Sequence, residues 1–284
     1  IAIEMALFFA RIGTRVVLVN RSRCLKHHDP EFGDEMKAAL QSETNLQVAA
    51  PGAIKSIEPD GGSARFTIEA EGRVLEFRSS RLLMAVGREP ATDGLGLAEA
   101  GIEVGNRRII HTAAMQTTNP DVYVAGDASG DYQILHIANQ EGAVAGANAA
   151  AGKPAQTMDY RLKMSVIFSD PPLAAVGMSG PELEQNGFRF AAGTARFSQT
   201  GRAITMGVEH GIWRLYADAA SGEILGSVIL GPGADDLIHI VSTMMRYRGT
   251  VRDILDGMPW YHPTQSEVIM NLAREIIPQL DPAS

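Results

Sequence analysis

An apolar helix pattern that leads directly into a short uncharged run is the feature that most constrains the fold of this chain. Met5, Phe8 and Ile12 recur at helical spacing within residues 1–13. Residues 15–19 read Arg-Val-Val-Leu-Val, and a β-branched run of this length is typical of a buried parallel strand. A helix followed by such a strand indicates the second half of a βαβ unit, although any α/β unit gives the same pattern.

A second helix and several strands are expected next. Asp29 as a capping acid and Pro30 at the first helical position predict the start of this helix. Its buried face would carry three apolar side chains: Phe32, Met36 and Leu40. Short alternating segments across residues 46–77 predict a meander of antiparallel strands. Residues 81–86 predict a core strand, because they are apolar and uncharged inside.

A third stretch combines a strand with a long helix. Residues 121–127 read Asp-Val-Tyr-Val-Ala-Gly-Asp, which predicts a strand that ends in a glycine and an acid. The helix expected over residues 134–151 is rich in Ala and Gly, and such small side chains let another backbone or a flat ligand come close. A change in composition near Gly152 places a domain boundary near Thr157.

The remaining residues predict a separate α+β domain. Ser179 and Glu182 have the form of a capping box that opens a helix. Strands are expected over residues 166–168, 174–176, 188–197, 211–217 and 224–230, and helices over 234–247 and 265–276. An antiparallel sheet with helices on one side follows from this order. The fold class is therefore a partial α/β Rossmann-like nucleotide-binding part followed by an α+β domain.

Composition excludes several classes of function. The formal net charge of -8 disfavours binding to nucleic acid or to an anionic membrane. Cys24 is the only cysteine, so neither an internal disulfide nor a cysteine-based zinc site can form, and no metal site is expected. This cysteine usage fits a cytoplasmic setting. No apolar run reaches about 18 residues, so no transmembrane helix is expected.

Polar and basic residues follow the first strand. Asn20 stands where NAD sites place an acid for the ribose 2′-hydroxyl, and Arg21, Arg23 and Lys26 come after it. A neutral and basic turn of this kind can bind the 2′-phosphate of NADP. A solvated basic turn explains the same residues, and their spacing does not separate the two interpretations.

Two further places carry side chains suited to chemistry. Asp127 would end a strand where open α/β sheets bind ligands, although a turn or capping aspartate is the alternative. Thr264 or Ser266 can cap the last helix, which would place Glu267 in its first turn and near His262. A carboxylate that holds one imidazole nitrogen fixes the tautomer and raises the basicity of the other nitrogen, as a general base requires. A surface histidine beside a glutamate at a helix start is the alternative.

In this order the segments resemble the carboxy-terminal portion of the pyridine nucleotide–disulfide oxidoreductase family (class I), in its dihydrolipoamide dehydrogenase form. The resemblance spans essentially the whole chain. The motifs that carry it are residues 1–6, 85–90, 117–127, 135–142, 166–177 and 233–238, and His-Pro-Thr-x-x-Glu at 262–267. The flavin motif at 117–127 and the His-Glu dyad are specific as a pair. The resemblance implies a partial NAD(P)-binding domain at 1–90, the carboxy-terminal part of an FAD-binding domain at 91–156, and a dimerisation domain at 157–284.

The resemblance also implies roles for single residues at two cofactor sites. At the FAD site, Asp127 would bond the ribityl chain, and the backbone near Leu135 and His136 would approach the flavin ring. Glu4 and Gly87 would lie along the nicotinamide half of NAD or NADP. The basic residues of NADP-using members would correspond to three side chains: Asn20, Arg21 and Lys26.

The dyad has an implied role that requires a second subunit. His262 would act as acid and base and would be oriented by Glu267. In the family this dyad serves the active site of the partner subunit, so the resemblance implies a homodimer. Electrons would pass between the nicotinamide cofactor, FAD and a small-molecule or protein-bound disulfide.

Some family parts are missing from the 284 residues. The first flavin glycine motif and the redox cysteine pair are absent, and Cys24 is interpreted as incidental. The chain therefore resembles a truncated enzyme that is inactive by itself. Glutathione reductase and a soluble transhydrogenase remain open as parents, while mercuric reductase is disfavoured because residues 280–284 carry no cysteine pair. A non-catalytic dimerisation module is the alternative of another class.

Overall fold

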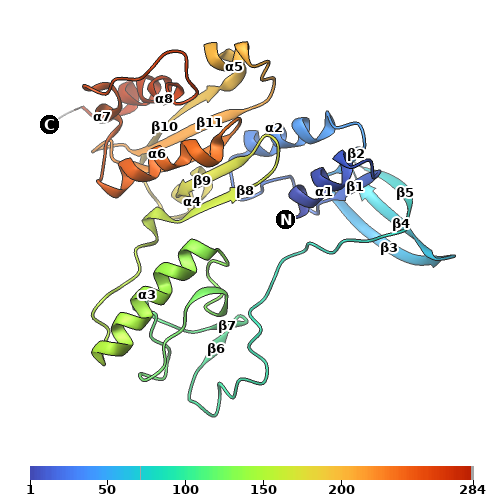
Figure 1. The fold of residues 1–284 in the computed structure, drawn as a ribbon, viewed down its shortest axis with the longest axis horizontal. Coiled ribbons are helices and arrows are strands. Elements are labelled where there is room, and N and C mark those ends of the chain that lie inside the picture. Colours follow the sequence, from blue (N-terminus) through green and yellow to red (C-terminus); the bar gives the residue numbers. More distant parts are fainter. Residues whose placement is uncertain (71, 283–284) are drawn as a thin grey trace. The chain divides into compact units, whose positions relative to one another are not determined.

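The computed structural model describes residues 1–70 and 72–282. Glu71 of the expected turn and Ala283 and Ser284 of the tail lie outside these described residues. The chain forms two compact units, which are considered separately (Figure 1). The larger unit joins residues 1–85 to the chain from Met164 onward, and the smaller unit is residues 86–163.

The larger unit begins with the expected helices and a parallel strand pair. Its first elements are α1 (Ala2–Arg11), β1 (Val16–Val19), α2 (Pro30–Gln41) and β2 (Leu46–Ala49). β1 and β2 pair in parallel, with Leu18 opposite Val48. The prediction that the strands of residues 46–77 form an antiparallel meander is therefore wrong for β2. The crossover through α2 returns the chain in the same direction, and this connection makes a parallel pair.

The rest of the expected meander forms, but the strand expected after it does not. β3 (Gly52–Asp60), β4 (Ser63–Ala70) and β5 (Arg73–Ser79) make a three-stranded antiparallel sheet. Residues 81–86 are not a strand, and their large apolar side chains are exposed. A strand needs a neighbour for its backbone N–H and C=O groups, and no described residue pairs with this segment. An apolar sequence alone is therefore not sufficient to make residues 81–86 a strand.

The second part of the larger unit is built on a five-stranded antiparallel sheet with the order β10-β11-β12-β9-β8. The strands are β8 (Met164–Ile167), β9 (Leu173–Gly177), β10 (Phe190–Arg196), β11 (Ile212–Asp218) and β12 (Ile224–Leu230). The helices are α4 (Gly180–Gln185), α5 (Gly201–Thr205), α6 (Ala234–Arg246), α7 (Val251–Leu255) and α8 (Val268–Ile276). Short 3-10 turns are η2 (Tyr160–Leu162, in the smaller unit), η3 (Phe197–Gln199) and η4 (Ile277–Gln279). All five strands and the Ser179–Glu182 capping box were predicted from the sequence, whereas α5 and α7 were not.

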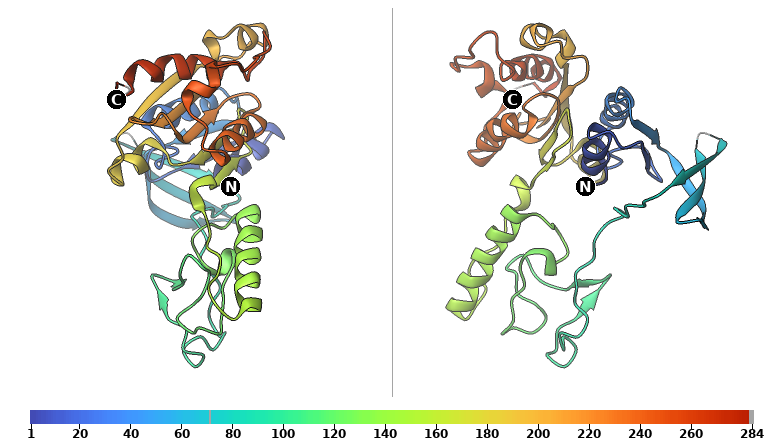
Figure 2. Two further views of the ribbon diagram at one scale, coloured as in Figure 1. Left: turned by 90° about the vertical axis from the view of Figure 1, so that its left-hand side faces the viewer. Right: turned by 45° about the vertical axis from the view of Figure 1, so that its right-hand side comes forward.

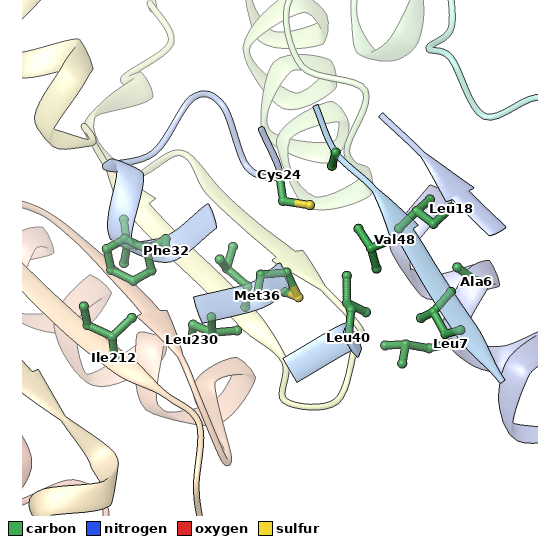
Figure 3. Close-up of a cluster of buried hydrophobic side chains, with 14 of the residues drawn as sticks. Ala6, Leu7, Leu18, Cys24, Phe32, Met36, Leu40, Val48, Ile212 and Leu230 are labelled. Atoms are coloured by element: carbon green, nitrogen blue, oxygen red, sulfur yellow. The ribbon is translucent and has the colours of Figure 1, made fainter. Parts of the chain in front are cut away.

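The two faces of this sheet are buried by different parts of the unit. Side chains alternate along a strand, so Tyr216 and Trp213 point to opposite faces. Tyr216 belongs to a core cluster shared with α2 (Figure 3), whose members include Phe32, Met36, Leu40, Ile212 and Leu230. α6 and α8 lie on the other side of the sheet, as the right view of Figure 2 shows. The helices that follow the sheet in the sequence therefore share one face, as expected.

The smaller unit is held together mainly by one helix and irregular chain. Its elements are β6 (Val104–Gly105), β7 (Arg108–Ile109), the 3-10 turn η1 (Gly126–Ala128) and α3 (Leu135–Ala151). The strand predicted over residues 121–127 is absent, since only an isolated bridge joins Tyr123 to Gln116. Val124 is still buried, beside Ile102 and Ile109. The apolar pattern predicted the burial of Val124 correctly. Among the described residues, however, no neighbouring strand extends the pairing beyond this single bridge.

None of the helices in the described part of the chain is long and apolar enough to span a bilayer.

Candidate functional site

His262 and Glu267 form a hydrogen-bonded pair at the start of α8. Nδ1 of His262 lies 3.0 Å from each carboxylate oxygen of Glu267. The imidazole is 75% exposed, whereas the carboxylate is only 16% exposed. Because Nδ1 faces an acceptor, it carries the proton in the neutral ring, and Nε2 is left as the basic, solvent-facing nitrogen. This arrangement suits a group that takes and returns protons at Nε2.

The turn before α8 holds Glu267 toward the imidazole. The backbone N–H of Thr264 donates to the Glu267 carboxylate at 3.2 Å, and the Thr264 hydroxyl donates to the Tyr261 carbonyl at 2.8 Å. α8 begins at Val268, three residues later than expected, with Glu267 itself at the N-cap position. The N-cap residue is therefore neither Thr264 nor Ser266, although the Thr264 hydroxyl accepts a hydrogen bond of 3.4 Å from the Glu267 backbone N–H. From this position at the start of the helix, the Glu267 carboxylate reaches back to the His262 imidazole.

The basic side chains of the turn after β1 differ in what they contact, since one binds the protein backbone and two are exposed to solvent. The Arg23 guanidinium donates to the backbone carbonyls of Leu25 and Lys26, at 3.1 Å each, and to that of His28. It braces the turn and is not available to a ligand. Arg21 and Lys26 have exposed side chains. Asn20 is fixed by its backbone, which pairs with Ala49 and Gly52 on the neighbouring strands.

Asp29 starts α2, but its side chain does not cap that helix. The carboxylate instead accepts hydrogen bonds from Arg214 at 2.9 Å and from the Tyr216 hydroxyl, both on β11. Burial and the adjacent carboxylate raise the pKa of Tyr216 above its usual value. The acid expected to serve the local helix therefore joins α2 to the five-stranded sheet.

Glu4 lies on α1 and is also held within the larger unit. Its carboxylate accepts a hydrogen bond of 2.9 Å from the backbone N–H of Phe168. The Phe168 side chain itself is exposed. Glu4 thus connects the first helix to the end of β8.

The smaller unit presents Asp127 on a sharply folded turn. Gly126 has a φ of 69°, and a β-carbon there would lie 3.2 Å from Ala138 of α3. A side chain at this position would be both strained and crowded, which explains the glycine. The Asp127 carboxylate is exposed, and its nearest cation is Arg88, at 3.8 Å. Arg88 is in turn fixed by two hydrogen bonds of 3.2 Å to Gln133.

Three other candidate residues of the smaller unit are exposed. Leu135 and His136 are the first two residues of α3, and both side chains face solvent. Gly87 has a φ of 119° in an extended loop. The sequence did not single out Arg88 or Glu141. The signal for Glu141 was available, since it is the only charged residue in α3 besides the amino-terminal histidine and it lies among Ala and Gly.

The remaining candidates for a reactive group are the Cys24 thiol and any cluster of metal-ligating side chains. Cys24 is buried, and burial raises the pKa of its thiol, which makes the thiolate scarce. A buried thiol in a packed core fits the interpretation of this residue as incidental. Across residues 1–70 and 72–282 no group of three or more His, Cys, Asp or Glu side chains is placed to hold a metal ion.

Two family models match the chain. The model described as "Pyridine nucleotide-disulphide oxidoreductase" matches residues 1–142, and the model described as "Pyridine nucleotide-disulphide oxidoreductase, dimerisation domain" matches residues 164–273. Between them they cover every candidate residue of the sequence analysis. They therefore bear on both units of the structure.

Curated relatives and solved structures agree with these models. A dihydrolipoyl dehydrogenase of Thermus scotoductus is 33% identical over 281 residues, which are 97% of this chain and 60% of that protein. A mercuric reductase of Bacillus cereus is 29% identical over 263 residues, 92% of this chain and 41% of that protein. The chain thus spans only about half the length of such relatives.

The structural neighbours show the same fold at low identity. The HOCl-induced flavoprotein disulfide reductase RclA from Escherichia coli matches with a TM-score of 0.80 and 23% identity, over 96% of this chain and 62% of that chain. LpdA from Mycobacterium tuberculosis matches with a TM-score of 0.80 and 22% identity, over 95% of this chain and 58% of that chain.

Proposed function

The chain belongs to the pyridine nucleotide-disulphide oxidoreductase family. We propose that the product of its complete natural coding sequence, called the natural polypeptide below, passes electrons between a nicotinamide cofactor, FAD and a disulfide or dithiol substrate. A dihydrolipoamide dehydrogenase-like reaction is the form that we favour. The observation that carries this proposal is the His262–Glu267 pair, with Nδ1 bound at 3.0 Å and Nε2 toward solvent. Disulfide exchange needs such a proton carrier to keep a thiolate available.

The chemistry of the residues proposed for the FAD site suits that group. The exposed carboxylate of Asp127, on the tight turn before α3, can accept hydrogen bonds from the hydroxyls of a flavin ribityl chain. Leu135 and His136 would present backbone to the ring. FAD, when bound, would supply the two-electron carrier that no side chain here provides. Glu4 and Gly87 are proposed to lie along the nicotinamide.

We propose that catalysis requires a homodimer. The match to the dimerisation domain covers the five-stranded sheet and most of α8, so it includes the dyad. The imidazole is exposed on this chain, and the resemblance to the family implies that the dyad serves the active site of the partner subunit. His262 would therefore serve a disulfide that lies on another subunit of a homodimer.

Activity of the natural polypeptide tests this function. Purified from its own coding sequence, it should oxidise NADPH or NADH in the presence of lipoamide or glutathione disulfide. The 284-residue chain alone should show no turnover, because its only thiol is buried. Disulfide-dependent turnover by the short chain would contradict the second expectation. A polypeptide that binds no flavin and reduces neither disulfide would favour the non-catalytic dimerisation module instead.

The basic turn predicts a preference for NADP over NAD. Arg21→Ala or Lys26→Ala should weaken NADPH binding about tenfold and leave NADH binding nearly unchanged, since only NADPH carries the 2′-phosphate. Nucleotide titrations of the natural polypeptide measure both constants. Arg15→Ala is the matched control, because Arg15 is an exposed arginine just before β1. Binding of NADH that equals or exceeds that of NADPH in the unsubstituted protein would remove the proposal.

A further inference from the structure

Glu141 of α3 is a fully buried carboxylate to which no role has been given above. Its exposed fraction is 0%, and its helix is otherwise composed mostly of small and apolar side chains. An ionised carboxylate loses its hydration on burial, so it is tolerated only where the protein supplies strong donors. The donors around Glu141 therefore indicate what this side chain does.

The first of these donors comes from the turn that carries Asp127. Oε2 of Glu141 accepts the backbone N–H of Gly126 at 2.7 Å and lies 3.5 Å from the Ser129 hydroxyl. Gly126 and Ser129 stand immediately before and two residues after Asp127. The Ser129 hydroxyl also donates to the Gly126 carbonyl at 2.8 Å, which closes the turn on itself. The carboxylate oxygen thus holds the turn at Gly126, and Ser129 closes the turn onto that residue.

The other oxygen holds a second segment of the same unit. Oε1 of Glu141 accepts a hydrogen bond of 2.7 Å from the Tyr160 hydroxyl. Burial and the neighbouring Glu141 raise the pKa of Tyr160 above its usual value, which keeps the hydroxyl protonated as a donor. The Tyr160 ring also packs against Tyr132, with 5.1 Å between the ring centroids. Tyr160 therefore fixes the carboxylate from the side opposite the turn.

We propose that Glu141 is a positioning residue that holds the Gly126–Ser129 turn so that the Asp127 carboxylate faces the flavin ribityl chain. This inference rests on the proposed function, since it names a residue that acts through Asp127 at the same FAD site. Glu141 itself is fully buried and acts through the backbone of the turn. Its contribution is to fix the backbone before the cofactor arrives, which lowers the ordering cost of binding.

Substitution of Glu141 in the natural polypeptide tests this role through FAD affinity. Glu141→Ala should raise the dissociation constant of FAD about tenfold to a hundredfold, because the turn loses a hydrogen bond to a charged acceptor. Glu141→Gln should give a smaller rise, since its amide oxygen still accepts the Gly126 N–H and its amide nitrogen can donate to the Tyr160 oxygen. Glu103→Gln is the control, because Glu103 is an exposed acid of the same unit. Titration of flavin-free protein with FAD, followed by visible absorption, gives the constants.

The outcomes separate this inference from the proposed function. Asp127→Ala is measured in parallel. If Asp127→Ala weakens FAD binding and both Glu141 variants bind FAD like the unsubstituted protein, the positioning role is wrong and the flavin site stands. If none of the three variants changes FAD binding, the flavin site itself is misplaced. A Glu141→Ala protein that fails to fold leaves Glu141→Gln to decide, and a lower Tm without weaker FAD binding in that variant also overturns the role.

Discussion

Replacing His262 by alanine in the natural polypeptide is expected to lower kcat for disulfide reduction about a hundredfold to ten-thousandfold. The exposed imidazole has its Nδ1 held by the Glu267 carboxylate, so the substitution removes the proton carrier and leaves Glu267 without the ring that it orients. FAD binding should be unchanged, because the candidate flavin residues lie in the other unit. Steady-state kinetics with a saturating nicotinamide cofactor measure the effect.

Two further variants make this result specific to the dyad. Glu267→Gln should reduce kcat about tenfold, since the amide oxygen still orients the ring but no longer stabilises its positive charge. His239→Ala is the matched control, because His239 is an exposed histidine of α6 that lies outside the dyad. The role of His262 is contradicted if His262→Ala and His239→Ala have equal kcat, or if reduction of the flavin by the nicotinamide is the step that slows.

Replacing Asp29 by alanine is expected to lower the free energy of unfolding by about 3 kcal/mol. Asp29 is 17% exposed and Arg214 is 15% exposed, so the substitution leaves the Tyr216 hydroxyl without its carboxylate and the Arg214 guanidinium with only the more exposed Glu31. Buried polar and charged groups that lose a partner cost more than the pair contributed. Denaturation by urea, followed by circular dichroism of the 284-residue chain and of the natural polypeptide, measures the change.

Glu31 provides a control within the same cluster. Its carboxylate also pairs with Arg214, at 3.2 Å, but it is 46% exposed. Glu31→Ala should therefore cost less than about 1 kcal/mol, as is usual for solvent-screened ion pairs. Adding Arg214→Met to Asp29→Ala should recover part of the lost stability, because the buried guanidinium, which then has only the exposed Glu31 as its partner, is removed. Equal effects of Asp29→Ala and Glu31→Ala would show that burial of the first pair does not matter.

Elements with their own periodicity could be located from the sequence. α1, α2, α6 and all five strands of the antiparallel sheet were expected within a few residues of where they lie, because burial of one face leaves a repeat of 3.6 or 2 residues. The dyad was also predictable, since His262 and Glu267 are five residues apart and a single turn brings them together. Their proposed role in catalysis stays a prediction.

Pairing between distant segments could not be located in this way. Residues 81–86 and 121–127 have apolar patterns like those of strands, but a strand exists only where a neighbour completes its hydrogen bonds. β2 was expected in an antiparallel meander, and only its register with β1 showed a parallel pair. Strand pairing is a property of two segments, so one segment's sequence leaves it open.

The sequence by itself determined which residues are buried along regular elements and which local turn unites His262 with Glu267. Only the tertiary structure decided the partners of the buried charges. Asp29 meets Arg214 across 185 residues, and Glu141 meets Gly126 across 15 residues from a helix to a turn. The hydrophobic periodicity of a helix or strand predicts that a side chain is buried, because apolar residues repeat along the face of the element that is shielded from water. It does not record which donor satisfies a buried carboxylate, since that donor can come from any segment that packs against it.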